Sequence, residues 1–303
     1  MRSTKLKPLD QQVIVITGAS SGIGLATAIL AAERGAKVVL AARSEATLAA
    51  VVEQINASGG DSIFISCDVS SATQIEQLVK RTLDHYGRID TWVNNAGVTI
   101  YGRLDEVSEG DSRELFNTNF WGVYHGALAV LPHLKRHGGA LINLGSKSSE
   151  ANVPYQGMYS ASQLAIKGFI DALRLEIEEL DHSPVTITLI EHNFTNTPFR
   201  QHAKNEMSSK PKIPEPLDDP KDVAEAILAA ATSSTHSKKV RGVSKNETAA
   251  KITSKQILGE KPRNAEGCLL RASEFVSGAG NVYGIRRKHD ARRNSGIKVI
   301  LKP

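Results

Sequence analysis

A glycine-rich segment near the start of the chain has the composition of a phosphate-binding loop. Residues 17–24, Thr17-Gly18-Ala19-Ser20-Ser21-Gly22-Ile23-Gly24, follow an apolar run and open an amphipathic stretch. Gly18 permits a sharp exit from a strand, Gly22 lets backbone approach a pyrophosphate, and Gly24 lets the next helix pack closely on a sheet. The N–H groups at the start of that helix would face the phosphates. This context favours dinucleotide binding over a glycine-rich turn without a ligand.

The chain around this loop alternates short apolar runs with longer amphipathic stretches. The apolar runs, each expected to form a buried strand, are 13–16, 37–40, 62–65, 91–93, 140–144 and 185–190. The stretches with helical periodicity are 22–34, 46–57, 72–86, 160–180 and 222–231. Such alternation predicts an α/β fold with a doubly wound parallel sheet. The pattern weakens after Pro198, and the prolines between 210 and 220 indicate a loop or flap.

Two further motifs follow the loop along the chain. Asn94-Asn95-Ala96-Gly97 comes after the fourth apolar run, and a tyrosine-centred motif begins at Tyr159. With the Gly-x3-Gly-x-Gly spacing of the loop, they resemble the short-chain dehydrogenase/reductase family over roughly residues 10–232. The resemblance implies a single Rossmann-type domain with a flap at about 194–220, and NADP-dependent hydride transfer between a carbonyl and a secondary alcohol.

The resemblance also implies an active group of Asn, Ser, Tyr and Lys. Tyr159 would act as general acid or base on the substrate oxygen, Ser146 would polarise that oxygen, and Asn119 would anchor a proton relay. The family lysine would hold the ribose and lower the tyrosine pKa. This chain has Gln163 at that position.

The loss of the lysine charge can be sized. A cation about 5 Å from the phenol, at an effective dielectric near 20, is worth roughly 3 kcal/mol, or about two pKa units. Glutamine can still hydrogen-bond a ribose hydroxyl but supplies no charge. We therefore expect a rate reduced by ~10²-fold near neutral pH, with oxidation affected more than reduction because oxidation needs the tyrosinate.

The end of the second strand indicates which cofactor is used. In the family an acidic residue there binds the ribose of NAD, whereas this chain has Ala42 followed by Arg43 and Ser44. Arginine forms strong bonds to phosphate, so we expect NADP, although a solvated surface role for Arg43 is the alternative. The other cofactor contacts that the resemblance implies are Thr17, Gly18, Ser20, Ser21, Gly22, Ile23, Gly24, Asp68, Val69, Asn95, Ala96, Gly97, Tyr159, Gln163 and Thr197.

Other cations and one histidine lie near these motifs in the sequence. Lys167 is one helical turn beyond Gln163 and Lys147 follows Ser146, so either is a candidate to replace the missing charge. His192-Asn193 stands where the family usually has Pro-Gly. His192 would titrate near pH 6.5, but a lone histidine at a strand end is more often structural.

The segments expected to face the substrate are mainly apolar. They are Val153, Pro154, Tyr155, Met158, Phe194, Phe199 and the proline-rich residues 211–220. They are compatible with a hydrophobic carbonyl or alcohol, or they simply pack the flap. Two long helices, about 111–136 and 160–180, correspond to the family's dimer surface, so the resemblance implies a homodimer or homotetramer.

Composition argues against a disordered, a collagen-like or a disulfide-scaffold protein. The 303 residues are 41% hydrophobic and 23% charged, with a mean hydropathy of −0.22, which is typical of a globular chain. No apolar run approaches the ~20 residues of a membrane span. Cys67 and Cys268 are too few for a disulfide framework or a metal cluster, so we expect no metal and a cytoplasmic location.

Charge is unevenly distributed along the chain. Residues 236–303 carry 16 Lys and Arg against 5 Asp and Glu, a balance of +11, whereas the remainder is at −6. We expect residues 233–303 to form a basic C-terminal extension that is solvated or partly disordered. No nucleic-acid motif accompanies the basic clusters, so nucleic acid is not an expected partner, and contact with an anionic surface is the alternative role.

Two functions from different classes fit these observations. The motifs favour an NADP-dependent oxidoreductase. Gln163 keeps open a non-catalytic NADP(H)-binding sensor or scaffold, in which the glutamine only positions the ribose.

Overall fold

The computed structural model describes residues 6–147, 153–207, 217–233 and 237–239. The chain divides into two compact units, Met1–Glu260 and Lys261–Pro303, and all described residues belong to the first. No helix in these described ranges is both long and apolar enough to cross a membrane. The expected extension at 233–303 lies almost entirely outside the described residues, as does Cys268.

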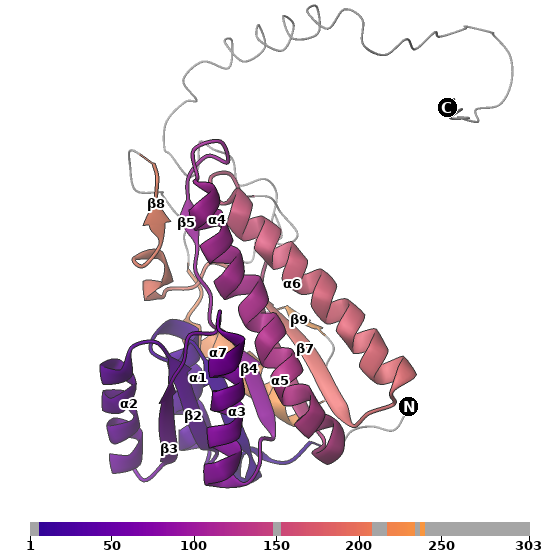
Figure 1. The fold of residues 1–303 in the computed structure, drawn as a ribbon. Helices are drawn as coiled ribbons and strands as arrows, with labels where there is room; N and C mark the ends of the chain where they lie inside the picture. Colours follow the sequence, from indigo (N-terminus) through magenta and orange to yellow (C-terminus); the bar gives the residue numbers. More distant parts are fainter. Residues whose placement is uncertain (1–5, 148–152, 208–216, 234–236, 240–303) are drawn as a thin grey trace, which may run out of the picture. The chain divides into compact units, whose positions relative to one another are not determined.

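A seven-stranded parallel sheet forms the centre of the first unit (Figure 1), with the order β3-β2-β1-β4-β6-β7-β9. Its strands are β1 Val13–Thr17, β2 Lys37–Ala42, β3 Asp61–Ser66, β4 Thr91–Asn94, β6 Gly139–Ser146, β7 Val185–His192 and β9 Ser237–Lys239. The first six each contain one of the predicted apolar runs. Because both faces of the sheet are covered, β1 is buried at every position rather than at alternate ones.

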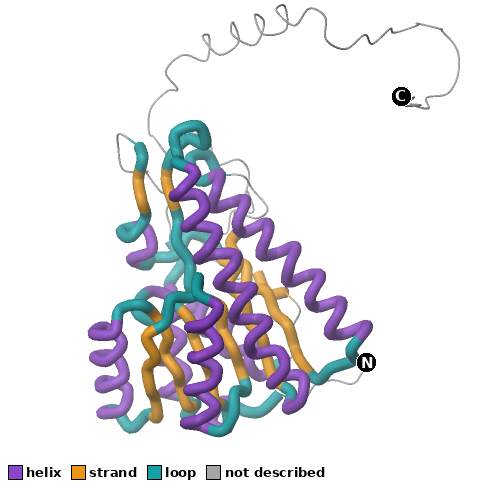
Figure 2. Tube along the Cα trace, in the orientation of Figure 1, coloured by secondary structure: helices purple, strands orange, loops and turns teal. Residues whose placement is uncertain are grey.

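Helices cover both faces of the sheet (Figure 2), as the alternation predicts. One apolar cluster joins the sheet to α1 Gly22–Glu33, α2 Glu45–Ala57 and α7 Pro220–Thr232. A second cluster joins the other face to α3 Ala72–Tyr86, α5 Gly122–His137 and α6 Gly157–Leu175. The doubly wound Rossmann-type fold is thereby confirmed.

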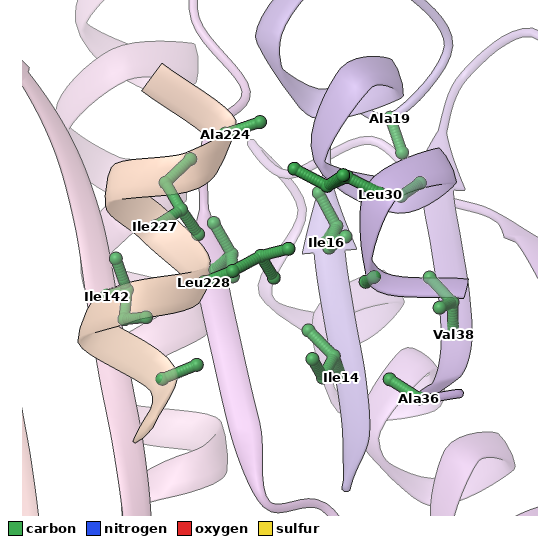
Figure 3. Packing of buried hydrophobic residues seen from close by; sticks show 14 of the residues in the cluster. Ile14, Ile16, Ala19, Leu30, Ala36, Val38, Ile142, Ala224, Ile227 and Leu228 are labelled. Carbon is green, nitrogen blue, oxygen red and sulfur yellow. The ribbon is translucent and has the colours of Figure 1, made fainter. Parts of the chain in front are cut away.

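The first cluster shows how β1 is held in place (Figure 3). Ile14 and Ile16 of β1 are fully buried and lie in one cluster with Leu30 of α1 and with Ile227 and Leu228 of α7. Burying one such side chain contributes about 1.5–3 kcal/mol. The strand that leads into the glycine-rich loop is therefore fixed by two helices far apart in sequence.

Buried amides tie the central strands together. Asn94 at the end of β4 donates from Nδ2 to Oδ1 of Asn143 in β6 at 2.9 Å, and accepts at Oδ1 from the indole Nε1 of Trp92 at 2.7 Å. Buried polar groups are costly unless they are hydrogen-bonded. Asn94 therefore supports the sheet immediately before the loop that carries Asn95.

Two small elements differ from the sequence expectation. β5 Ile100–Tyr101 and β8 Lys204–Asn205 pair in parallel as a separate two-stranded sheet. β9 pairs with β7, so the main sheet continues past the expected boundary at residue 232. Strands of two or three residues have no detectable periodicity of their own, because they depend on a partner distant in sequence.

The two long helices contain wide turns. The expected helix at 111–136 comprises α4 Glu109–Phe116, a π-helical turn Asn117–Trp121, and α5. The expected helix at 160–180 is α6 followed by a second π-helical turn, Glu176–Leu180. Such turns are often found at functional sites.

Candidate active site

The glycine-rich loop adopts a backbone that only glycine accommodates at two positions. Gly18 has φ +66°, and a Cβ there would lie 2.8 Å from Cα of Ala96. A Cβ on Gly24 would lie 2.4 Å from the carbonyl oxygen of Gly18. The first turn of α1 is thereby packed directly against the loop.

Asn95 holds the loop in this shape. Its Nδ2 donates to the carbonyl oxygens of Thr17 at 2.8 Å and Gly18 at 3.2 Å. In return, the backbone N–H groups of Asn95 and Ala96 donate to Oγ1 of Thr17 at 3.0 and 3.2 Å. Thr17 and Asn95, expected at the cofactor, are therefore engaged in bracing the loop that would bind it.

The start of α1 remains open to an anion. Ser21 is the N-cap residue, and its side chain makes no capping hydrogen bond. The first-turn N–H groups have no partner within their own helix and attract negative charge. A Cβ on Gly22 would lie 3.1 Å from Cβ of Thr197, so the segment after β7 reaches this end of the helix. These residues fit a dinucleotide pyrophosphate.

The end of β2 presents a free positive charge. Arg43 is exposed, and its guanidinium forms no ion pair within the described part of the chain. Ser44 is exposed beside it, with its hydroxyl 2.8 Å from that of Thr47. Asp68 after β3 accepts at Oδ1 from the N–H and hydroxyl of Ser70 at 2.9 and 2.7 Å. Arg43 is therefore available to an external anion, whereas Oδ1 of Asp68 is engaged locally.

Ser146 and Tyr159 meet at the end of the sheet. Ser146 is the last residue of β6, Tyr159 lies in the first turn of α6, and their side chains are hydrogen-bonded. The ring of Phe199 packs edge-on against Tyr159 with centroids 5.9 Å apart. Burial raises the pKa of Tyr159 to about 12, and the bond from Ser146 opposes this rise only in part.

Asn119 connects the π-helical turn to Tyr159. Its Nδ2 donates to the carbonyl oxygen of Val98 and to Oγ of Ser162, both at 3.0 Å, and its Oδ1 accepts from the Val98 N–H at 2.8 Å. Ser162 in turn donates to the carbonyl oxygen of Tyr159 at 2.7 Å. Asn119 thus positions the start of α6, and its side chain is fully used in doing so.

Gln163 lies one turn beyond Tyr159 on α6. Its side chain is buried and makes no hydrogen bond to any residue in the described ranges. An uncommitted amide at this position fits a role in binding a polar group such as a ribose hydroxyl. It supplies no charge to Tyr159.

Lys167, one of the two lysines that could replace the missing charge, lies near two carboxylates. The Nζ of Lys167 lies 3.8 Å from Asp171 and 3.9 Å from the buried Glu191. The groups that shift the pKa of Tyr159 within the described structure include neither Lys167 nor Lys147. The hypothesis of a compensating lysine therefore gains no support.

A family model described as short chain dehydrogenase matches residues 12–208. The chain belongs to the short-chain dehydrogenase family. An uncharacterized oxidoreductase of Bacillus subtilis (strain 168), YxnA, is 41% identical over 230 residues, which are 75% of this chain and 64% of that protein. This short-chain dehydrogenase thus spans less than two thirds of that relative.

Solved structures of the family share the fold. A short-chain dehydrogenase/reductase from Burkholderia phymatum in complex with NAD is 26% identical, with a TM-score of 0.72, covering 78% of this chain and 91% of that one. An alcohol dehydrogenase from the archaeon Thermococcus sibiricus complexed with 5-hydroxy-NADP is 29% identical, with a TM-score of 0.67, covering 78% and 98%. The two similar proteins bind different forms of the nicotinamide dinucleotide.

In this short-chain dehydrogenase His192-Asn193 stands where the family usually has Pro-Gly, and His192 closes the turn there. Its Nδ1 lies 2.7 Å from the carbonyl oxygen of Asn193 and 3.1 Å from Oγ1 of Thr195. Burial lowers the pKa of His192, opposed by the bond to Asn193 and by the charge of Asp218. The imidazole therefore fits the structural alternative better than the role of a group titrating near pH 6.5.

Three residues near the site carried no signal in the sequence. Asp218 clamps the segment after β7, since its N–H donates to Phe194 O and its carbonyl accepts from the Asn196 N–H, both at 2.9 Å. Tyr101 adds to the burial-driven rise in the pKa of Tyr159. Burial also raises the pKa of Tyr101 itself, and the charge of Arg200 opposes that rise. No local pattern reveals these residues, because their proximity arises only when β5 and the segment after β7 meet.

The residues expected to line the substrate side are only partly brought together. Phe199 contacts Tyr159, and Tyr155 accepts at its carbonyl oxygen from the N–H of Gly102 at 2.9 Å. Tyr155 has φ +63°, an uncommon conformation for a residue with a side chain. Val153 is buried. Residues 211–216 of the predicted flap lie outside the described residues.

Proposed function

We propose that this chain is an NADP-dependent oxidoreductase that interconverts a carbonyl and a secondary alcohol, with a rate reduced by Gln163. The observation that carries the proposal is the hydrogen-bonded pair Ser146 and Tyr159 beside a braced glycine-rich loop. The unpaired guanidinium of Arg43 supports NADP over NAD, because it offers charge-assisted bonds to a 2′-phosphate.

Each residue of the pair has a defined task. Bound NADP(H) supplies or accepts the hydride. Tyr159 is protonated near neutral pH and donates its proton to the substrate oxygen during reduction. Ser146 stabilises the phenolate left behind and polarises the same oxygen. In the oxidation direction Tyr159 would have to be ionised, and its raised pKa makes the ionised form scarce at pH 7.

The second candidate function is a non-catalytic NADP(H)-binding sensor or scaffold. It is favoured by a specific observation, the buried Gln163 with no cation acting on Tyr159 in the described structure. The phosphate loop, Arg43 and Thr197 would serve binding in either case.

Titration with NADPH and NADH, followed by nicotinamide fluorescence, tests the binding that both functions need. We expect tight binding with a preference for NADPH. Turnover of NADPH with a broad panel of carbonyl compounds then separates the two functions. If the natural protein turns over none of them and Gln163→Lys creates activity, the chain is a binder. If neither cofactor binds, both proposals are wrong.

We also propose a homodimer or homotetramer in the cytoplasm. The helices expected at the family's dimer surface expose Trp121 and Leu128 around α5 and Leu164 and Leu175 on α6, between 38% and 56% of each side chain. Exposed apolar side chains on neighbouring helices are typical of an interface. Light scattering of the purified protein tests the assembly, and a monomer at micromolar concentration would contradict it.

A further inference from the structure

A second positive group stands near the active site without a partner. Arg200 ends the short 3-10 helix Pro198–Arg200 and is half-buried. Its guanidinium makes no ion pair or hydrogen bond within the described ranges. The neighbouring Lys204 is different, because its Nζ is paired with Asp111 and lies 3.3 Å from Glu206.

The segment that carries Arg200 runs from the phosphate loop to the catalytic tyrosine. Thr197 lies against Gly22, and two residues later the ring of Phe199 packs on Tyr159. Phe199 also lies over Gly97, where an added Cβ would be 3.9 Å from Cε2 of the ring. Arg200 therefore follows immediately on a residue that touches the reacting group.

Tyr101 lies in β5 of the small sheet, close enough to Arg200 for the guanidinium to affect its pKa. Burial raises the pKa of Tyr101 and the charge of Arg200 opposes this rise, while Tyr101 adds to the rise in the pKa of Tyr159. Tyr101 is 4% exposed, and its hydroxyl makes no hydrogen bond within the described part of the chain. The hydroxyl itself is not sealed from solvent, so it can donate a hydrogen bond to a bound ligand.

Pairing on both sides fixes the backbone of Tyr101. On one side it is the register partner of Asn205 in β8, and its carbonyl oxygen accepts from the N–H of Glu206 at 2.8 Å. On the other side Gly102 bridges to Gln156, three residues before Tyr159. The main chain that carries the phenol of Tyr101 is therefore held in place by its neighbours.

We propose that Arg200 and Tyr101 bind a carboxylate of the substrate, so that the chain acts on oxo acids or hydroxy acids whose reacting carbon lies at Tyr159. A guanidinium supplies paired donors that match a carboxylate, and a phenol adds a further donor. The position of the reacting carbon at Tyr159 rests on the proposed function, whereas the anion site itself does not. The diphosphate of the cofactor is the competing source of an anion for Arg200.

The test compares unbranched oxo acids with their methyl esters. Binding of each to the full-length protein saturated with NADPH is measured by calorimetry, and kcat/KM is measured by NADPH oxidation. Acids should bind better than esters by about 10- to 100-fold, the range of one charge-assisted hydrogen bond. Arg200→Met, which keeps an apolar stem, should remove that preference and leave ester binding unchanged.

Two further variants keep the result interpretable. Lys204→Gln removes a charge of the same sign from the neighbouring strand and should retain the preference for acids. Tyr101→Phe should weaken acid binding in part, and it provides the test should Arg200→Met fail to fold. The inference is overturned if wild type binds acids and esters alike, if Lys204→Gln loses as much as Arg200→Met, or if Arg200→Met weakens only NADPH binding.

The outcomes also separate this inference from the proposed function. Selective binding of acids without any oxidation of NADPH would support the anion site and contradict the oxidoreductase. Efficient reduction of neutral carbonyls with no selectivity for acids would support the oxidoreductase and contradict the anion site.

Discussion

The hydroxyl of Ser146 is hydrogen-bonded to the phenol of Tyr159, joining the end of β6 to the first turn of α6. Burial raises the pKa of Tyr159 by more than this hydrogen bond lowers it, so the pKa is about 12. Gln163, one turn further along α6, offers no charge that would lower it. In the proposed function, Tyr159 would therefore serve as a proton donor at neutral pH.

The two reaction directions should depend differently on pH. Because Tyr159 is protonated well below its pKa of about 12, reduction should be nearly independent of pH between about 6 and 9. Oxidation needs the ionised phenol, so its rate should rise about tenfold per pH unit over the same range. Initial rates in both directions, at saturating cofactor, check this. An oxidation rate that levels off near pH 7 would contradict it.

Arg43 should select the phosphorylated cofactor. Arg43→Ala should weaken NADPH binding by about 10- to 100-fold, the range of one charge-assisted hydrogen bond, and leave NADH binding unchanged. Arg34→Ala is the matched control, since Arg34 is also exposed but is paired with Glu225 at 2.6 Å. Fluorescence titrations of the three proteins decide, and equal losses for both cofactors would show that Arg43 does not contact the 2′-phosphate.

Gly24→Ala should abolish cofactor binding. The new Cβ would lie 2.4 Å from the backbone oxygen of Gly18 and 2.5 Å from Nδ2 of Asn95, so the loop and its brace must shift. Gly168→Ala on α6 is the control, because a Cβ there meets nothing within 4 Å. It should stabilise the protein by about 0.5–1 kcal/mol, as Ala is the better helix former. Normal NADPH binding by Gly24→Ala would rule out the proposed geometry of the loop.

Asn119→Ala should reduce both stability and rate. The variant leaves the half-buried N–H and carbonyl of Val98 without their side-chain partners, which costs about 1 kcal/mol, and frees the Ser162 link to Tyr159. Asn117→Ala, at an exposed position of the same π-helical turn, should change neither. Denaturant unfolding and turnover are the measurements. An Asn119→Ala protein as stable as wild type would show that the bridge is dispensable.

The main sheet and the loop were predictable because their signals are local. Ile14 and Ile16 belong to a strand buried on both faces, so the apolar run itself marks β1. Gly18 and Gly24 report close backbone contacts through residue type alone. The Ser146–Tyr159 pairing was predictable only through the family resemblance, since the two residues meet through the fold.

The rest of the site depends on tertiary contacts that leave no local pattern. Tyr101 and Arg200 lie in elements of two and three residues, whose position is set by the β5–β8 pairing and by Phe199 on Tyr159. The clamp that Asp218 forms on the segment after β7 uses its backbone N–H and carbonyl oxygen, groups that nearly every residue type offers. The engagement of Lys167 by Glu191 likewise requires knowing which helix faces β7.

The central claim is that the missing lysine leaves Tyr159 protonated, and the pH profile of alcohol oxidation by wild type and Gln163→Lys tests it most directly. A cation at 163 should move the alkaline midpoint down by about two pH units from about 12 and raise the rate near pH 7 by ~10²-fold. Gln163→Met, which fills the position without a charge, should leave the midpoint in place. Identical profiles for wild type and Gln163→Lys, or a wild-type midpoint already near neutral pH, would contradict the account.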